Sequence, residues 1–288
     1  MNGKIIGSLA GVYVIYSEGV TYNVLPRGNL KFKKEHLCVG DDVLVDDDTL
    51  TIMAILPRKN ELIRPKSSNI DQLIIVMSIE EPSLSELLLY KFLTYANMNK
   101  VPAKVVFTKD DLIKDNERLT LLRNDLNKLE IENFVISNVT KEGLDEFKKI
   151  LEGKVSLFMG QTGVGKSSLL NSIDPSFDRK IGSYSIALGR GKHQTKEVIL
   201  LPYGDGFLGD TPGFSSLDLN LFKEDFASFY PGYQKYKDGC YFNDCLHQKE
   251  KGCKVKEAIE NGELPASSYE IYLKLLNELP YKKERYNL

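Results

Sequence analysis

The sequence has little of what marks a membrane or secreted protein. No uninterrupted apolar run approaches the ~20 residues that a bilayer span requires, and the opening residues MNGKIIGSLAG contain no apolar signal core. Only four residues are cysteine. Three of them lie in one short segment, and their spacing is typical of metal ligands rather than of a disulfide framework. We therefore expect a soluble, cytoplasmic protein that enters no membrane.

The chain also lacks a large net charge of either sign. Its formal net charge is −2 and its pI is about 6.0. A global basic field that drives nonspecific nucleic-acid binding is thereby excluded, so any RNA contact must come from local patches. With 288 residues, the chain has room for two or three domains of ~100 to 200 residues each.

Residues 1–66 consist of short alternating β segments without a helical period: GVYVIYS, VTYNVLP, DDVLV and TLTIMAIL. Several short strands in so short a stretch predict a small barrel, and an OB-type β-barrel that binds RNA is the best interpretation. Basic residues gather in two clusters, Arg27 with Lys31, Lys33 and Lys34, and Arg58 with Lys59, Arg64 and Lys66. On charge alone, a solvated face with a linker explains these clusters as well as an RNA-binding patch does.

Residues 67–218 alternate between apolar strands and amphipathic helices. Examples are the strands DQLIIVMS and PAKVVFT, the helix SELLLYKFLTYANMNK between them, and a charged helix near Asn116 to Leu129. Near-continuous apolar strands separated by such helices predict a parallel sheet covered on both faces. We expect a doubly wound α/β domain whose ligand lies at the carboxyl ends of the strands.

A phosphate-loop motif lies in this domain, in the stretch KVSLFMGQTGVGKSS. Glycines allow backbone N–H groups to wrap a phosphate, and the following helix N-terminus favours negative charge. Lysine supplies a point charge for the outer phosphates, and the serine hydroxyl supplies a ligand for Mg²⁺. A flexible glycine turn is the alternative, but the strand before the motif and the helix after it argue against that. The predicted nucleotide-binding residues are Gly160, Gln161, Thr162, Gly163, Val164, Gly165, Lys166, Ser167 and Ser168.

A second motif, Thr108-Lys109-Asp110-Asp111, directly follows the strand PAKVVFT. It resembles the N/T-K-x-D motif with which GTPases recognise guanine. The Asp111 carboxylate can accept hydrogen bonds from the ring N–H and the 2-amino group of guanine, which adenine does not offer. Lys109 would lay its aliphatic stem along the base. A helix N-cap with acidic residues is the alternative interpretation.

The next strand ends in Ile136-Ser137-Asn138, at the place where GTPases commonly have Ser-Ala closing over the base. Ser137 fits this pattern and Asn138 departs from it. We include Ser137 among the candidate base contacts, while an ordinary strand-to-helix loop explains the segment almost equally well.

Two segments after the phosphate loop have the pattern of GTPase switches. The first is long, polar and glycine-punctuated and ends GRGKHQTKE. Within it, Thr195 is expected to close on Mg²⁺ and the γ-phosphate. His193 could position water, but an exposed or partner-binding histidine is the slightly favoured interpretation. The second is Asp210-Thr211-Pro212-Gly213, in which Asp210 would hold Mg²⁺ through water and the Gly213 N–H would sense the γ-phosphate.

The order of these motifs is unusual, because the base motif precedes the phosphate loop. The sheet is therefore expected to be that of a circularly permuted GTPase, with the second switch leading directly out of the domain. Phe214 stands where Ras-like enzymes have the glutamine that orients water. An apolar side chain cannot orient water, so we expect hydrolysis to be slow until another group assists.

Residues 219–288 mix helical stretches with a cluster spaced C-x4-C-x-H-x5-C. Three thiolates and one imidazole can close a tetrahedron around Zn²⁺ without an open position, so we expect one structural zinc ion in a mainly α domain. Unrelated reduced cysteines would not crowd so closely. The predicted ligands are Cys240, Cys245, His247 and Cys253.

Together, these motifs resemble the small ribosomal subunit biogenesis GTPase family, RsgA, over essentially the whole chain. The resemblance implies a GTPase with an OB domain and a zinc domain that binds the 30S subunit through its 16S rRNA, assists late maturation there, and is stimulated by the ribosome. GTP or GDP with Mg²⁺ and one Zn²⁺ are the implied ligands, and a monomer fits the design. Two alternatives remain open from the residues, a GTPase acting on a non-ribosomal protein partner and an ATP-using phosphate-loop enzyme.

Overall fold

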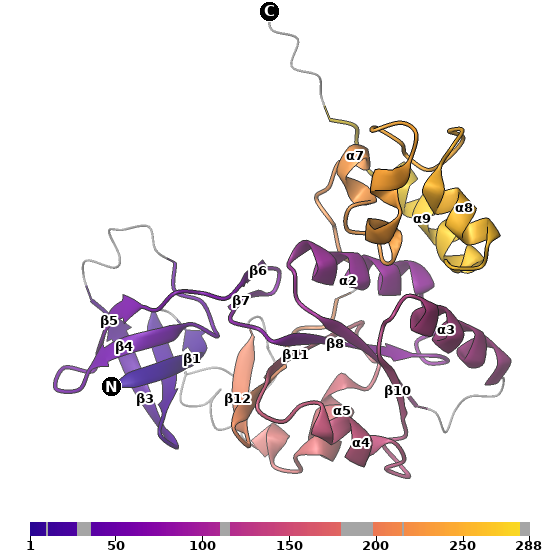
Figure 1. The fold of residues 1–288 in the computed structure, drawn as a ribbon. Coiled ribbons are helices and arrows are strands. Elements are labelled where there is room, and N and C mark those ends of the chain that lie inside the picture. Colours follow the sequence, from indigo (N-terminus) through magenta and orange to yellow (C-terminus); the bar gives the residue numbers. More distant parts are fainter. Residues whose placement is uncertain (10, 28–35, 110–115, 180–197, 215, 283–288) are drawn as a thin grey trace, which may run out of the picture.

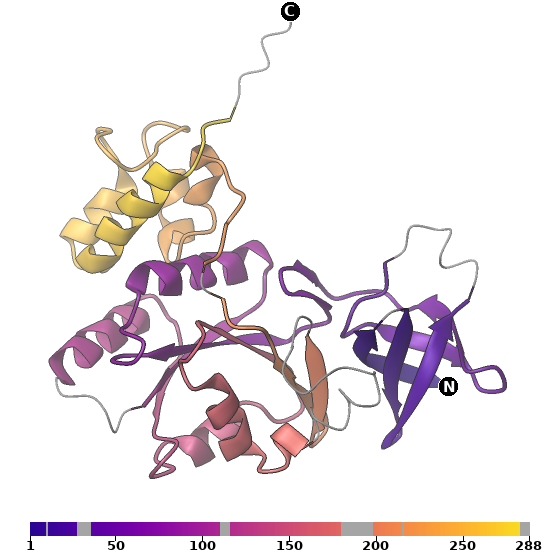
Figure 2. The ribbon, with the colours of Figure 1, turned by 180° about the vertical axis from the view of Figure 1, so that it is seen from behind.

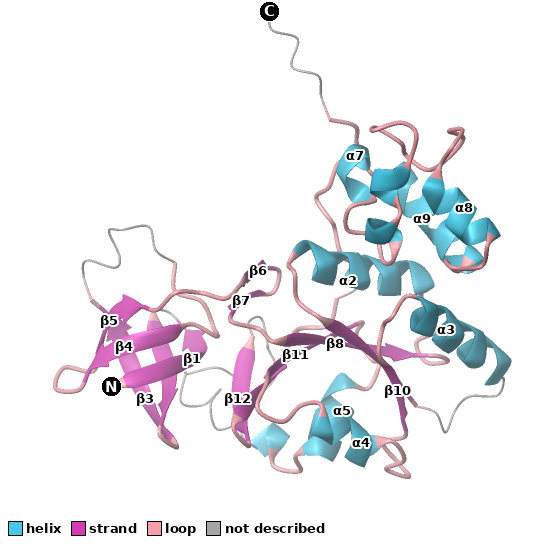
Figure 3. Cartoon of the chain, in the orientation of Figure 1, coloured by secondary structure: helices cyan, strands magenta, loops and turns pink. Residues whose placement is uncertain are grey.

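A computed structural model describes residues 1–9, 11–27, 36–109, 116–179, 198–214 and 216–282. Three bodies follow one another along the chain (Figure 1). An N-terminal barrel lies beside one edge of a central sheet, and a helical C-terminal body lies over the helices that cover one face of that sheet. Figure 3 shows that strands make up the first body and helices the last, while the middle contains both.

The N-terminal body is a closed five-stranded barrel in the order β1-β2-β3-β5-β4. It closes where β1 pairs antiparallel with β4, and its centre is filled by buried aliphatic side chains such as Val14, Val43 and Ile52. The predicted barrel is confirmed. The strands are β1 (Asn2–Leu9), β2 (Val12–Ser17), β3 (Val20–Pro26), β4 (Asp42–Asp46) and β5 (Thr51–Ile55).

Strand β1 was not expected as a strand of its own. Ile5 and Ile6 are adjacent in the sequence and both buried, beside a register shift between Ile5 and Gly7. A bulge of this kind breaks the period-2 alternation by which a half-buried strand is recognised.

A short hairpin, β6 (Glu61–Ile63) with β7 (Lys66–Ser68), connects the barrel to the sheet. From the sequence, this stretch was expected to be a linker or a basic patch. In the structure, the backbone N–H of Ser68 donates to Val39 O at 2.9 Å, so the hairpin is attached to the barrel loop that precedes β4. Gly40 is needed in that loop, because a Cβ there would lie 1.9 Å from the Ser68 carbonyl oxygen.

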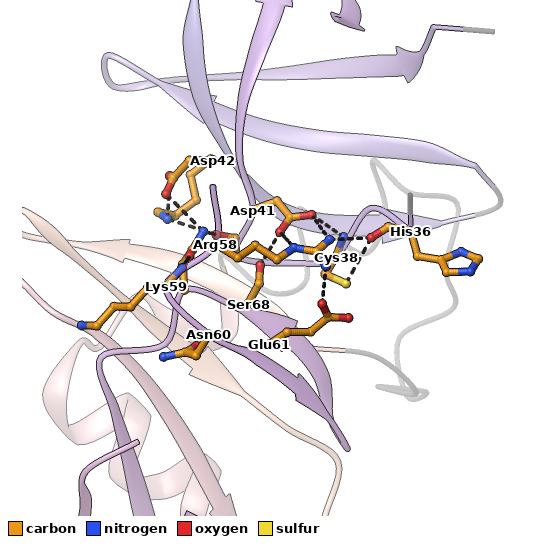
Figure 4. Close-up of polar contacts among 12 residues, drawn as sticks. His36, Cys38, Asp41, Asp42, Arg58, Lys59, Asn60, Glu61 and Ser68 are labelled. Carbon is orange, nitrogen blue, oxygen red and sulfur yellow. Dashed lines mark hydrogen bonds and ion pairs between the residues drawn. The ribbon is translucent and has the colours of Figure 1, made fainter. Parts of the chain in front are cut away.

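Asp41 holds this junction together (Figure 4). Its carboxylate is fully buried and accepts hydrogen bonds from the Ser68 hydroxyl at 2.5 Å and the Cys38 N–H at 2.8 Å. It also accepts from Nε and Nη2 of Arg58 at 2.7 and 2.8 Å, in a bidentate pair. Arg58 is therefore part of a structural ion pair rather than of a free basic patch, and Lys59 is likewise paired, with Asp71 at 2.6 Å.

The central sheet has six strands in the order β10-β9-β8-β11-β13-β12. Neighbouring strands are parallel except for β12, which runs antiparallel to β13 at one edge. The doubly wound parallel sheet is confirmed, and the antiparallel edge strand was not expected. The strands are β8 (Gln72–Ser78), β9 (Ala103–Thr108), β10 (Asn133–Ile136), β11 (Val155–Gly160), β12 (Ile199–Tyr203) and β13 (Gly206–Asp210).

Helices cover both faces of the sheet (Figures 1 and 2). Helices α2 (Glu86–Met98) and α3 (Asn116–Lys128) lie on one face, and α4 (Leu144–Lys149) and α5 (Lys166–Ile173) lie on the other. From β8 the chain adds β9 and β10 on one side, then returns to place β11 on the other. The crevice between the carboxyl ends of β8 and β11 is therefore the topological switch point, where ligands of such sheets bind.

The C-terminal body is mainly helical, as predicted, and packs on α2 and α3. It contains α7 (Lys223–Phe226), α8 (Lys254–Glu260) and α9 (Ala266–Glu278), with two short 3₁₀ turns. Tyr230 stacks on Tyr90 of α2 with ring centroids 5.5 Å apart, and the Lys91 ammonium pairs with Glu278 of α9 at 2.7 Å. None of the helices within the described residues is long and apolar enough to cross a membrane.

Replacing Asp41 with alanine should loosen the junction between barrel and sheet. The Arg58 guanidinium, the Ser68 hydroxyl and the Cys38 N–H would lose their shared acceptor, so we expect the free energy of opening of the β6–β7 amides to fall by about 3 kcal/mol. Hydrogen–deuterium exchange measures this change. Asp47→Ala is the matched control, because Asp47 is 69% exposed in its ion pair with the N-terminal amine and should change little. Equal exchange in both variants would contradict the role given to Asp41.

Candidate functional site

The phosphate-loop stretch folds as predicted, into a strand, a glycine turn and a helix. All six residues of β11 are buried between β8 and β13, and α5 begins at Lys166. Gly165 caps this helix with φ +90°, a conformation that favours glycine. A Cβ at Gly160 would lie 2.4 Å from Val76 O, so the loop can approach β8 only with glycine there. The turn lies at the switch point of the sheet.

Lys166 points back into this turn and is almost fully buried. Its ammonium lies 3.5 Å from the Asp210 carboxylate and donates a hydrogen bond to the Thr211 carbonyl oxygen. Burial lowers the pKa of Lys166, and the attraction of Asp210 partly offsets that effect. Burial likewise raises the pKa of Asp210, against the opposing effect of Lys166. Both charges are poorly solvated, which suits a site that takes up phosphate groups and a cation.

The Asp-Thr-Pro-Gly segment is attached to the same turn. The Thr211 hydroxyl donates to Phe158 O at 2.7 Å, and the Phe214 N–H donates to Gly160 O at 3.0 Å. Gly213 packs directly on Thr162, because a Cβ at Gly213 would lie 2.4 Å from the Thr162 hydroxyl oxygen. Movement of either segment must therefore be transmitted to the other.

The predicted base motif also contacts the phosphate loop. Thr108 ends β9 and is fully buried, and its hydroxyl reaches two carbonyl oxygens, Met77 O at 3.2 Å and Val164 O. Lys109 has φ +61°, and its ammonium donates to the Glu81 carbonyl oxygen. Asp110 and Asp111 lie outside the described residues, so their part of the motif remains a prediction.

Ser137 directly follows β10 and is buried. Its hydroxyl accepts a hydrogen bond from the Thr140 N–H at 3.1 Å, and its own N–H donates to Glu142 O. The side chain thus shapes the loop that leads into α4, which is the ordinary role that the sequence analysis left open for it. Ser137 follows the carboxyl end of β10, and Thr108 ends the neighbouring strand β9. For this reason Ser137 stays among the proposed base contacts.

Of the remaining predicted residues, some lie in the described part of the chain and others lie outside it. Ser167 and Ser168 are exposed in the first turn of α5. The Ser167 hydroxyl and the Asp210 carboxylate offer the oxygen ligands that Mg²⁺ prefers. One oxygen of Asp210 is buried and has no hydrogen bond within the described part of the chain. The residues present therefore fit a magnesium ion. His193 and Thr195 of the first switch lie outside the described residues.

Two groups beside the phosphate loop were not predicted from the sequence. The Glu81 carbonyl oxygen that binds Lys109 is a backbone atom, and no sequence motif marks it. Asn138 was noted only as a departure from Ser-Ala, yet its side-chain nitrogen lies 3.6 Å from the position that a Cβ on Gly165 would occupy. A polar amide at the end of a strand next to the base motif was the signal that could have identified it.

The four predicted metal ligands come together in the C-terminal body. One ligand atom from each of Cys240, Cys245, His247 and Cys253 lies within 4.8 Å of the others, and the His247 Nδ1 is 3.6 and 3.3 Å from the sulfurs of Cys240 and Cys253. Ligand bonds of about 2.0 to 2.3 Å place tetrahedral ligands roughly this far apart. Burial lowers the pKa of His247 to about 4, so its imidazole is neutral at pH 7, the form that binds metals.

The surroundings of the cluster hold its loop in place. The Glu250 carboxylate accepts from the N–H groups of Leu246, Gln248 and Lys249 at 3.0, 2.6 and 2.9 Å. The Tyr269 hydroxyl donates to His247 O at 2.8 Å, which attaches the loop to α9. Such outer contacts orient metal ligands, and the donor set fits a closed structural metal site.

Comparison with known proteins assigns the family. The RsgA GTPase family matches residues 55–220, which include both nucleotide motifs, and the RsgA N-terminal domain matches residues 2–52. The chain belongs to the RsgA GTPase family. The match at residues 2–52 covers most of the barrel, and the larger match spans the hairpin and the sheet.

Relatives of this RsgA-family chain extend over its whole length. It is 38% identical over 289 residues to the small ribosomal subunit biogenesis GTPase RsgA of Halalkalibacterium halodurans, covering 98% of both chains. It is 39% identical to the protein of the same name from Geobacillus kaustophilus, covering 99% of both. Among solved structures, it resembles YloQ, described as a circularly permuted GTPase, with a TM-score of 0.80 and 32% identity over 96% of this chain and 94% of that one. YjeQ from Thermotoga maritima gives a TM-score of 0.81 and 33% identity, over 96% and 98%. The RsgA fold is thus circularly permuted, as the motif order predicted.

The metal site of this RsgA-family chain can be tested by element analysis. We expect about one transition-metal ion per purified chain, and Cys253→Ser should lose it because three remaining ligands cannot close the tetrahedron. Loss of binding free energy on the order of 10 kcal/mol should also unfold the C-terminal body, which hydrogen–deuterium exchange would detect. Cys38→Ser, in the barrel, is the control and should keep the ion. Full metal content in Cys253→Ser would refute the assignment.

Proposed function

We propose that the chain is a GTPase that binds the 30S ribosomal subunit through 16S rRNA and assists late maturation of that subunit, hydrolysing GTP to GDP and phosphate. The observation that carries the proposal is the convergence of Thr108, Lys166 and Asp210 on one turn at the carboxyl edge of the sheet. Full-length relatives named for small ribosomal subunit biogenesis give the proposed partner. We place the domains at residues 1–66, 67–218 and 219–288.

In the proposed site, the phosphate loop and Lys166 bind the phosphates, while Lys109, Asp111 and Ser137 receive the guanine. Lys166 must then exchange its hydrogen bond to the Thr211 carbonyl for phosphate oxygens. This exchange frees the Asp-Thr-Pro-Gly segment to rearrange. Mg²⁺, held by Ser167, by Thr195 and through Asp210, neutralises phosphate charge when it is bound.

Slow hydrolysis by the isolated chain follows from where Phe214 lies. Its ring packs edge-to-face on Phe92 of α2 with centroids 5.9 Å apart, so it contributes to packing rather than to the orientation of water. We assign that task to His193 of the first switch or to a group of the ribosomal subunit. Stimulation by the small subunit is the expected consequence.

The two flanking bodies are the proposed ribosome-binding parts. A barrel of this type can hold RNA. The Cys₃His cluster is proposed to hold Zn²⁺, the ion that three thiolates and an imidazole most often bind in closed tetrahedral sites, and this ion supplies folding stability. We propose a cytoplasmic monomer.

Steady-state GTP hydrolysis tests the proposed activity and partner together. We expect purified small subunits to stimulate hydrolysis on the order of 100-fold or more, as a catalytic group supplied in trans does, and large subunits to have little effect. Lys166→Ala should abolish the activity in both conditions. GTP binding without stimulation by small subunits would refute the ribosomal partner while leaving the GTPase intact.

The contact between Phe214 and Phe92 connects the nucleotide site to the C-terminal body, because α2 also carries Tyr90 and Lys91, which bind that body. If nucleotide state controls ribosome affinity through this contact, Phe214→Ala should reduce the difference in small-subunit affinity between the GTP-analogue and GDP states. Phe222→Ala, in the same connecting segment but 42% exposed, should preserve it. Binding titrations measure both. An unchanged difference in Phe214→Ala would exclude this route.

A further inference from the structure

A cavity of about 500 Å³ lies where the barrel, the β6–β7 hairpin and the second switch meet. The barrel contributes residues such as Tyr13, the hairpin contributes residues 63–66, and the second switch contributes residues 212–214. Sites for small ligands usually have volumes of roughly 300 to 1,000 Å³. No phosphate-loop residue is among the described residues that line this cavity, so it is separate from the proposed nucleotide site.

The walls of the cavity suit a ligand with an apolar part. Leu37, Val39, Pro65 and Phe214 line it, and the described lining residues include no aspartate or glutamate. Contact with apolar walls removes apolar ligand surface from water, which favours binding. A carboxylate in the wall would repel an anion, and here none does. The cavity can therefore accept a ligand that carries negative charge as well as an apolar part.

The positive charge of the lining comes from the hairpin, through Arg64 and Lys66. The other two cations of this basic cluster, Arg58 and Lys59, are paired with carboxylates of the chain. Within the described residues, Arg64 and Lys66 form no such ion pair. Two cations that line one cavity without a carboxylate between them form a binding site for an anionic group.

The charged wall is held in place by contacts on two sides. The Arg64 N–H donates to the Tyr95 hydroxyl of α2 at 3.2 Å, and the Ser68 N–H donates to Val39 O of the barrel at 2.9 Å. Figure 1 shows the hairpin between the barrel and α2. Because these contacts already order the hairpin, a ligand does not have to order it, and the free-energy cost of binding is smaller.

Another wall of the cavity belongs to the second switch, through residues 212–214. The Phe214 N–H of this segment donates to the phosphate loop, and the Lys166 ammonium donates to the carbonyl oxygen of Thr211 just before it. A ligand in the cavity therefore contacts the segment that is expected to rearrange when phosphate takes the ammonium of Lys166.

We propose that this cavity binds a small amphipathic anion, with its anionic group on Arg64 and Lys66 and its apolar part against the second switch. The ligand thereby stabilises the arrangement in which Lys166 donates to the Thr211 carbonyl, and it opposes the rearrangement that GTP requires. Binding of the anion does not depend on the proposed function, whereas this coupling rests on it. By linkage, GTP weakens anion binding by the same factor by which the anion weakens GTP binding.

The test uses two fluorescent probes on the full chain. One is 8-anilinonaphthalene-1-sulfonate, and the other is N-phenyl-1-naphthylamine, which has the same aromatic body without the sulfonate. We expect the sulfonate probe to saturate one site per chain. In the double variant Arg64→Gln with Lys66→Gln, its affinity relative to that of the uncharged probe should fall about tenfold, because hydrogen bonds from two cations are lost. Fluorescence titrations give the four dissociation constants.

The double variant Lys235→Gln with Lys282→Gln is the matched control. It removes the same charge from lysines of the C-terminal body whose side chains are 59% and 53% exposed. It should keep the wild-type ratio between the two probes. An unchanged ratio in the hairpin variant would overturn the site, and so would an equal fall in both double variants.

The coupling is measured with the nucleotide site filled. The sulfonate probe should bind at least about fivefold more weakly to the chain saturated with a non-hydrolysable GTP analogue than to the chain saturated with GDP. Equal affinity in the two states would overturn the coupling. A chain that binds no guanine nucleotide would instead overturn the proposed function, and the ratio between the two probes on the nucleotide-free chain would still decide whether the cavity binds the anion.

Discussion

The structure depends on hydrogen bonds to the backbone carbonyls of the phosphate loop. The Thr108 hydroxyl donates to Val164 O at one end of the loop, and the Phe214 N–H donates to Gly160 O at the other. A loop of glycines has little side-chain packing to define its shape, and glycine loses more conformational entropy on ordering than any other residue. Contacts from neighbouring strand ends supply what the loop lacks. The base motif and the second switch are therefore structural supports of the loop as well as candidate ligand contacts.

These supports place the site in mechanical contact with both flanking bodies. On one side, Phe214 packs on Phe92 of α2, and Tyr90 and Lys91 of the same helix contact the C-terminal body. On the other side, the Asp71 carboxylate accepts from the Val155 N–H at the start of β11 and pairs with Lys59 of the segment that leaves the barrel. The strand that carries the phosphate loop is thus connected at its start to the segment that leaves the barrel, and at its end, through Phe214, to the helix that binds the C-terminal body.

Much of this arrangement could be predicted from the sequence, because glycine spacing and ligand spacing are set by local chemistry. The phosphate-loop turn and the Cys₃His cluster were predicted for that reason, and both are formed. What escaped prediction depends on distant partners. The hairpin β6–β7 is fixed by Asp41, which lies far away in the sequence. The pairing of Arg58 with the buried Asp41 cannot be inferred from a cluster of basic residues in the sequence. The antiparallel β12 has the same apolar pattern as a parallel strand.

Circular permutation explains why the supports lie where they do. In this chain β8 and β9 precede the phosphate loop, and the second switch is the last part of the sheet before the C-terminal body. A switch between two strands of a sheet is held by the sheet on both sides. A switch that follows the last strand is free to transmit its movement to the segment after it. We propose that Lys166 connects this segment to the nucleotide, because its ammonium donates to the Thr211 carbonyl oxygen and the same lysine is the predicted phosphate contact. On this proposal, phosphate in the site would take the ammonium away from the Thr211 carbonyl, and the segment leading to the C-terminal body would lose that restraint.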